Sequence, residues 1–222
     1  MQRTHMNDTD KSAGDSQPYA FGDYTHEEYV QLATNFHGYP APGIIVGGYM
    51  VATAKSRLAP DILFDAISET SWCLPDAVQI LTPCTAGNGW LQILDLAIFA
   101  VSLYDKTNGI GVRVSLDGEK VRQYGEIAAW FLKLREKKDQ DSDLLASQIR
   151  QAGASICSVE NVRVHEDFLK KRSKGSVGPC PGCGAVYPLN HGSKCGLCQG
   201  QSPYVRREAV LEPRLHPLSA HQ

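Results

Sequence analysis

The sequence lacks an apolar run long enough to cross a lipid bilayer. Its longest nearly apolar stretch, over 91–104, is interrupted by Asp95 and is shorter than the roughly 20 residues that a spanning helix needs. Residues 1–18 are polar and lack the apolar segment of a secretory signal. We therefore expect a cytoplasmic protein that does not insert into membranes, with seven cysteines that stay reduced.

A strong excess of charge of one sign is also absent. The 222 residues include 22 Lys and Arg against 24 Asp and Glu, which argues against a protein dominated by binding to phosphate backbones. The charge is uneven, because residues 1–150 carry 13 basic and 19 acidic side chains and residues 151–222 carry 9 and 5. The smaller C-terminal part is therefore the plausible anion-facing surface.

The composition changes along the chain and predicts four segments. Residues 1–23 are rich in Asp, Ser, Gln and Gly and predict a disordered tail. Residues 24–168 have the apolar content of a core domain, 169–178 form a basic linker, and 179–222 hold a cysteine-rich domain and tail. With 42% hydrophobic residues overall, the chain fits one or two globular domains.

Periodicity predicts helices and strands in the core domain. Thr25 and Glu28 have capping-box spacing at the start of a first helix that Gly38 ends. A helix over 44–58 is apolar on nearly every side, so we expect it to be central and buried. The other expected helices cover 74–81, 119–137 and 142–151. Strands are expected over 62–70, 110–116 and 155–165, the stretch 90–103 is expected to form one strand or a pair of strands, and an Asn-Gly turn is expected over 106–109.

The strongest chemical signal is a pair of Cys-x-x-Cys motifs, formed by Cys180 with Cys183 and by Cys195 with Cys198. This spacing is typical of a structural tetrahedral zinc site with four thiolate ligands. Iron, a redox disulfide and unrelated free thiols are the alternatives. His191 lies in the spacer, and we expect it on the surface because four cysteines already satisfy the ion.

Basic residues flank this predicted zinc domain and make nucleic acid a candidate partner. Aromatic groups that could stack on bases are limited to Tyr187 and Tyr204, so docking to a protein fits the segment better.

Polar, ligand-type side chains also occur in apolar parts of the core domain. His37 ends one helix, Cys73 and Asp76 stand at the start of another, and Cys84 opens a Gly-rich loop after it. Cys84 could be a reactive thiolate whose pKa is lowered by loop N–H groups, with His37 as its base. His37, Cys73, Cys84 and Asp76 could equally hold a soft or borderline metal ion. The simplest alternative is that both cysteines are small buried apolar residues.

The stretches around these residues resemble the FmdE family, the proteins related to the E component of formylmethanofuran dehydrogenase. The resemblance covers roughly residues 24–165 and the cysteine-rich tail. The matching positions are His37, Pro42, Gly43, Cys73, Asp76, Ala77, Cys84, Thr85 and Gly87. The sequence departs from the family pattern at Tyr39, where many members have His, and at Ala41, where they have Cys.

The resemblance implies an α+β core domain, a C-terminal zinc-binding domain of treble-clef or ribbon type, and a homodimer. It implies a metal-binding protein that is an accessory factor or enzyme-like, in one-carbon or molybdenum/tungsten metabolism. The candidate cofactors are a structural zinc ion and a second metal in the core domain. The partner would be an unknown small molecule or protein. The alternative is a non-enzymatic dimeric module whose zinc domain contacts nucleic acid or a protein.

Overall fold

The computed structural model describes residues 20–170 and 175–204, and the chain divides into two compact units, Met1–Leu169 and Lys170–Gln222. Most of the predicted N-terminal tail, part of the predicted linker and the end of the chain lie outside the described residues. No helix in the described part is both long and apolar enough to cross a membrane.

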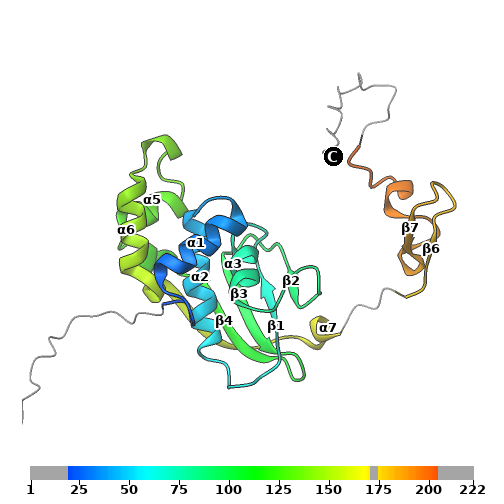
Figure 1. Cartoon of the computed structure of the whole chain (residues 1–222), viewed down its shortest axis with the longest axis horizontal. Coiled ribbons are helices and arrows are strands. Elements are labelled where there is room, and N and C mark those ends of the chain that lie inside the picture. Colours follow the sequence, from blue (N-terminus) through cyan, green and yellow to red (C-terminus); the bar gives the residue numbers. More distant parts are fainter. Residues whose placement is uncertain (1–19, 171–174, 205–222) are drawn as a thin grey trace, which may run out of the picture. The chain divides into compact units, whose positions relative to one another are not determined.

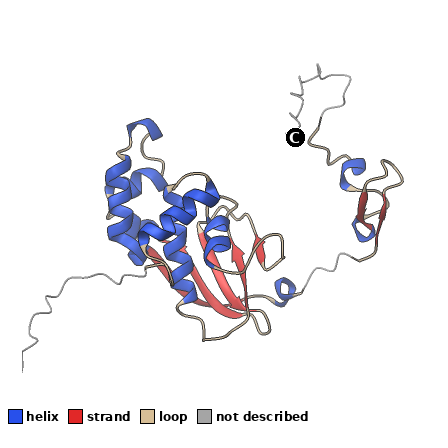
Figure 2. Ribbon diagram, viewed as in Figure 1, coloured by secondary structure: helices blue, strands red, loops and turns tan. Residues whose placement is uncertain are grey.

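The core unit has a five-stranded sheet in the order β2-β1-β3-β4-β5, in which β1 and β2 are parallel and the other neighbours are antiparallel. The strands are β1 (Phe64–Ser68), β2 (Leu91–Ile93), β3 (Ala100–Asp105), β4 (Ile110–Leu116) and β5 (Cys157–Arg163). The helices gather beside this sheet, and α2 (Pro42–Lys55) packs on β3, β4 and α3 (Leu74–Leu81) (Figures 1 and 2). The predicted α+β class is confirmed.

The predicted N-terminal helix is confirmed as α1 (His26–His37). Thr25 N donates to Glu28 Oε2 at 2.8 Å and Glu28 N donates to Thr25 Oγ1 at 3.2 Å, which completes the capping box. Gly38 ends the helix at a φ of 93°, a backbone conformation that favours glycine. Ordered structure begins before the expected position 24, because Phe21 is 2% exposed and stacks on Tyr29 with a 4.3 Å centroid distance.

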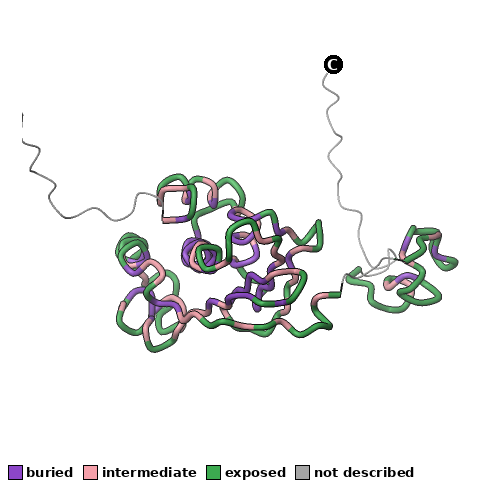
Figure 3. Tube along the Cα trace, turned by 90° about the horizontal axis from the view of Figure 1, so that it is seen from below, coloured by how far each residue is buried: buried purple, intermediate pink, exposed green. Residues whose placement is uncertain are grey.

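The predicted buried helix is α2, which lies between the sheet and the other helices. Buried residues concentrate in this interior, and exposed residues dominate the periphery (Figure 3). A Cβ added at Gly48 would lie 2.4 Å from Tyr29 Cε1, so only glycine lets α1 and α2 approach this closely. Tyr29 is fully buried, and its hydroxyl donates to Ile44 O at 2.8 Å.

Of the two alternatives for 90–103, the structure has the pair of strands, β2 and β3, and β1 lies between them in the sheet. One predicted helix differs from the structure. The single helix expected over 119–137 is instead α4 (Gly118–Val121) and α5 (Gly125–Phe131). Gly125 disfavours a continuous helix, and Gln148 Oε1 accepts hydrogen bonds from Glu126 N at 2.9 Å and Ile127 N at 3.3 Å, which caps α5 from outside.

The remaining elements complete both units. In the core unit they are η1 (Lys137–Asp139), α6 (Ser142–Ala152), η2 (Gly153–Ile156) and α7 (Glu166–Leu169). The C-terminal unit has the two-stranded sheet β6 (Val177–Pro179) and β7 (Val186–Pro188), with η3 (Leu189–His191) and η4 (Gly196–Gln199). Because β6 starts at 177, this unit begins inside the segment expected to be linker.

Candidate functional site

Cys73 stands where the chain leaves the loop after β1 and enters α3. Its backbone has φ 50° and ψ −45°, a left-handed φ that is uncommon outside glycine. The loop is fixed by a two-pronged ion pair in which Arg113 Nε and Nη2 donate to the Glu69 carboxylate at 2.6 and 2.7 Å. Ser68 Oγ adds a hydrogen bond to Thr70 O at 2.7 Å. These hydrogen bonds therefore fix the loop that holds Cys73 in its strained backbone conformation.

His37 lies between Asp76 and Cys73. Its Nδ1 is 2.6 Å from Asp76 Oδ2, in the first turn of α3, and its Nε2 is 3.9 Å from Cys73 Sγ. A carboxylate next to Nδ1 favours the tautomer of His37 that carries its proton on Nδ1, which donates to Asp76. The lone pair on Nε2 then faces the Cys73 thiol. The three side chains thus form the thiol–imidazole–carboxylate order that activates a cysteine nucleophile.

The Cys73 thiol keeps its proton in this setting. Burial raises the pKa of Cys73, and the nearby Asp76 carboxylate raises it further, while Lys133 acts in the opposite direction. His37 Nε2, at 3.9 Å, is the ring nitrogen that faces this thiol.

Cys84 lies elsewhere, in the hydrophobic core. It is fully buried, and its thiol donates to Phe64 O on β1 at 3.6 Å. Contrary to the expected lowering, burial raises the pKa of Cys84 to about 11. The Gly-rich loop does not offer its N–H groups to the sulfur, since Asn88 Oδ1 accepts from Thr85 N at 3.0 Å and from Trp90 N at 2.9 Å. Among the described hydrogen bonds, none joins Cys84 to His37, Cys73 or Asp76.

The core site offers few donors for a second metal. His37 Nε2 and Cys73 Sγ face one another, whereas a catalytic zinc site generally uses three protein ligands. Tyr39 is 54% exposed, and Ala41 is buried at the start of α2 with no donor atom on its side chain. Among the described residues, one group of three or more His, Cys, Asp or Glu side chains is close enough to share an ion. That group is the cluster of four cysteines in the C-terminal unit. The core site thus presents His37 Nε2 and Cys73 Sγ as its facing pair of donor atoms.

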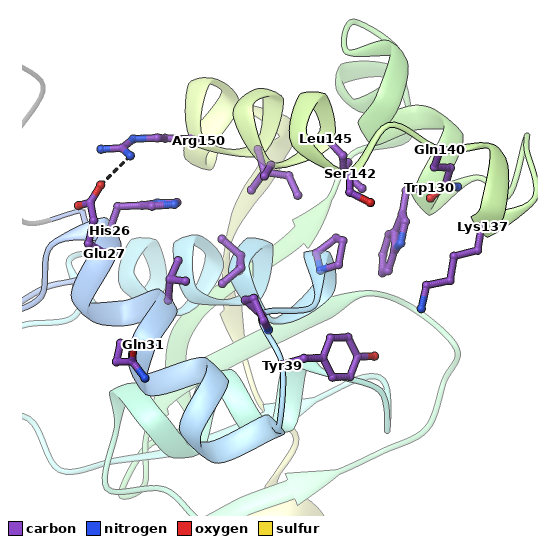
Figure 4. A pocket seen from close by; sticks show the side chains of 16 residues that line it. His26, Glu27, Gln31, Tyr39, Trp130, Lys137, Gln140, Ser142, Leu145 and Arg150 are labelled. Carbon is purple, nitrogen blue, oxygen red and sulfur yellow. Dashed lines mark ion pairs between the residues drawn. The ribbon is translucent and has the colours of Figure 1, made fainter.

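A cavity of about 670 Å³ adjoins this core site. It is lined by α1, α2, α5, α6, the loop between α1 and α2, and the segment between α5 and α6, and Figure 4 shows its side chains. The Tyr39 ring at its edge is 5.3 Å from the His37 ring, centroid to centroid. A Cβ at Gly43 would lie 3.0 Å from Cys73 Sγ and 3.4 Å from Cη2 of Trp130, which also lines the cavity. The core site and the aromatic end of the cavity are thus neighbours. No sequence pattern indicates this cavity, because its walls come from several separate segments.

The predicted four-cysteine cluster forms in the C-terminal unit. The sulfurs of Cys180, Cys183, Cys195 and Cys198 all lie within 4.8 Å of one another. Cys183 Sγ and Cys195 Sγ are 3.6 Å apart, close to the roughly 3.8 Å between sulfurs at a tetrahedral ion with bonds of about 2.3 Å. The cluster therefore fits a single zinc ion.

The protonation of these thiols supports the same conclusion. The Cys195 N–H donates to Cys180 Sγ at 3.4 Å and lowers the pKa of Cys180 to about 6. Hydrogen bonds with the sulfurs of Cys183 and Cys195 raise the pKa of Cys198 to about 12. Four thiolates this close cannot all ionise without a cation, and an ion at their centre would release the retained protons. His191 is exposed and lies outside the cluster, as expected.

Both units match known protein families. The family model described as "FmdE, Molybdenum formylmethanofuran dehydrogenase operon" matches residues 36–166, and the model "FmdE treble clef zinc finger" matches residues 171–205. The predicted treble-clef type of the C-terminal domain is confirmed.

Two individual proteins are similar to this chain in sequence, and one of them has a solved structure. A crystal structure of an FmdE-like protein of the tungsten formylmethanofuran dehydrogenase type, from Syntrophus aciditrophicus, is 52% identical, with a TM-score of 0.77 over 83% of this chain and 97% of that chain. A protein from Archaeoglobus fulgidus named "Probable S-adenosyl-L-methionine-binding protein" is 31% identical over 153 residues. The match covers 62% of this chain and 41% of that relative, so the chain spans about two fifths of its length. Since a family model matches more than half of its residues, the chain belongs to the FmdE family.

Proposed function

We propose that the core unit is an accessory or enzyme-like component of one-carbon metabolism that acts on a small molecule through the Cys73 thiol. The observation that carries this proposal is the position of His37, whose ring is bonded to Asp76 on one side and faces the Cys73 sulfur on the other. The family description, which names a formylmethanofuran dehydrogenase operon, supports the metabolic setting.

The chemistry follows from the order of the three side chains. His37 Nε2 takes the thiol proton, and the Asp76 carboxylate stabilises the resulting imidazolium. The sulfur then attacks an electrophilic carbonyl carbon, such as that of a formyl or acyl group, and forms a thioester. The departing group leaves with its bonding electron pair and takes the proton from His37. Water or a second acceptor later releases the carbonyl group from the sulfur.

Reaction of the thiol with iodoacetamide tests this proposal. Cys73 should be alkylated at least about tenfold faster than Cys84 near neutral pH, because Cys84 is fully buried with a raised pKa. Peptide mass spectrometry reads both cysteines in the same sample. His37→Ala should slow alkylation of Cys73 about tenfold, and Cys84→Ser should leave its rate unchanged. Equal rates at Cys73 in the wild type and His37→Ala would overturn the proposal.

A metal in the core is the competing proposal. His37 and Cys73 would be its two protein ligands, and other ligands would come from the bound molecule or water. Asp76 would then orient His37 through Nδ1, as outer-shell carboxylates do in metal sites. Loss of iodoacetamide reactivity on adding zinc, restored by a chelator, would favour this alternative.

We further propose that the zinc-binding C-terminal unit is a protein-docking module that contacts a second copy of the chain. Within the described residues 175–204, Lys194 is the single Lys or Arg. Five large hydrophobic side chains are exposed there: Val177, Val186, Leu189, Leu197 and Tyr204. Exposed apolar side chains of this kind favour contact with protein.

Light scattering after size exclusion tests this second proposal. A mass near twice that of the 24.3 kDa chain, reduced to one chain by Val186→Asp, would support a homodimer that uses this surface. A monomer that binds DNA or RNA in a salt-dependent manner would favour the nucleic-acid alternative.

A further inference from the structure

The cavity beside the core site has an unbalanced charge. Its charged lining side chains are Glu27, Lys137 and Arg150. Arg150 Nη1 and Glu27 Oε1 are 2.6 Å apart, so these two charges compensate each other at one end (Figure 4). His26 adds no charge near neutral pH, because burial and the nearby Arg150 lower its pKa. Lys137 is left as the net positive charge of the cavity.

Lys137 lies at the opposite, aromatic end. Figure 4 shows Tyr39, Trp130 and Lys137 around the same opening, and Lys137 Nζ is 5.9 Å from the centroid of the Tyr39 ring. Within the described residues, no carboxylate lies within ion-pair distance of Lys137, whereas its neighbour Lys138 contacts Glu136 at 2.8 Å. The Trp130 ring at the same opening has a second cation over it, Lys133 Nζ at 4.6 Å. Ammonium groups beside aromatic rings favour a planar group that carries a negative charge.

The rest of the wall is apolar. Ile45 from α2 and Leu145 and Ile149 from α6 line the cavity between its two charged ends. The volume of about 670 Å³ lies in the range of roughly 300–1,000 Å³ that is typical of small-molecule sites. The cavity can therefore enclose most of one cofactor-sized molecule.

We infer that this cavity binds a planar aromatic molecule with a single anionic group, whose anion contacts Lys137 and whose rings lie against Tyr39 and Trp130. The inference deepens the proposed function, because it names the class of molecule that would be presented to Cys73. The anionic end would then lie near His37, since the Tyr39 ring contacts both the cavity and the His37 ring.

Two fluorescent probes that differ in one charge test this inference on the full chain. The first is 8-anilino-1-naphthalenesulfonate, an aromatic anion with a planar naphthalene ring, and the second is N-phenyl-1-naphthylamine, the same skeleton without the sulfonate. Lys137→Met should raise the Kd of the anionic probe about tenfold and change that of the neutral probe less than about twofold. Tyr39→Ala, at an exposed position, should weaken both probes. Lys138→Met, which alters a cation outside the cavity, is the matched control and should weaken neither.

Three results would overturn the inference: equal effects of Lys137→Met and Lys138→Met on the anionic probe, equal loss of both probes in Lys137→Met, or no saturable binding of either probe. The inference can fail separately from the proposed function. Cys73→Ser should bind the anionic probe as the wild type does, because the Cys73 side chain is not part of the cavity lining. If the reactivity of Cys73 proved independent of His37, the proposed function would fail, but the expected binding of the two probes would not change.

Discussion

The Nδ1 atom of His37 lies 2.6 Å from Oδ2 of Asp76, 39 positions further along the sequence. This contact joins the last residue of α1 to the first turn of α3 and turns the other ring nitrogen toward Cys73. Asp76 thereby sets the orientation of the base without touching the thiol itself.

Asp76→Asn should separate the orienting role of this residue from a role in stability. The amide keeps the size of the side chain but removes the charge that stabilises an imidazolium at His37. We expect alkylation of Cys73 by iodoacetamide to slow about tenfold or more near neutral pH, with the urea midpoint nearly unchanged. Asp143→Asn, at an exposed position in the first turn of α6, is the control. An unchanged alkylation rate in Asp76→Asn would show that Asp76 does not orient His37.

Gly48→Ala tests the close contact between α1 and α2. The added Cβ would lie 2.4 Å from Tyr29 Cε1, and the fully buried ring has little room to move. We expect the free energy of unfolding to fall by about 1–3 kcal/mol or more, measured by urea denaturation. At Gly87 the nearest atom to an added Cβ is 3.9 Å away, so Gly87→Ala should be close to neutral. Similar losses for the two variants would contradict the packing argument.

The buried Cys84 thiol should make the protein less stable in alkali. Burial raises its pKa from 9.0 to about 11, whereas the thiol of the unfolded chain ionises near the ordinary value. The unfolded state therefore loses this proton first, and the Cys84 contribution to the free energy of unfolding falls as pH rises from about 9 to about 11.

Urea denaturation of the wild type and Cys84→Ala across this pH range measures the effect. Cys157, another buried thiol with a raised pKa, acts equally in both proteins. Cys84 also raises the pKa of Tyr104, so the difference between the two curves reports Cys84 together with this coupling. The stability advantage of the wild type should shrink as pH rises. A difference that stays constant would mean that the Cys84 pKa is not raised in the folded protein.

Local features were predictable from the sequence, and features that depend on packing were not. The capping box of Thr25 and Glu28 and the spacing of Cys180 with Cys183 act over three residues, so the sequence pattern already determines them. The environment of Cys84 depends on its burial against β1, which no local pattern reports. The sequence placed His37, Cys73, Asp76 and Cys84 in one candidate site. The structure brings the first three together and leaves Cys84 against β1.

The cavity is the clearest case of information absent from the sequence pattern. Tyr39, Trp130, Lys137 and Arg150 occupy four different segments that only the folded helices bring together. The break between α4 and α5 has a similar origin, since Gln148 from α6 supplies the cap that starts α5.

The central claim is that the chain keeps a metal in its C-terminal unit and a reactive thiol in its core. Metal content per chain, measured by elemental mass spectrometry, tests it most directly. We predict about one zinc per chain in the wild type and in a Cys73→Ser/His37→Ala double variant, and almost none in Cys180→Ser. A second equivalent of metal in the wild type that is lost in the double variant would contradict this claim and make His37 and Cys73 metal ligands.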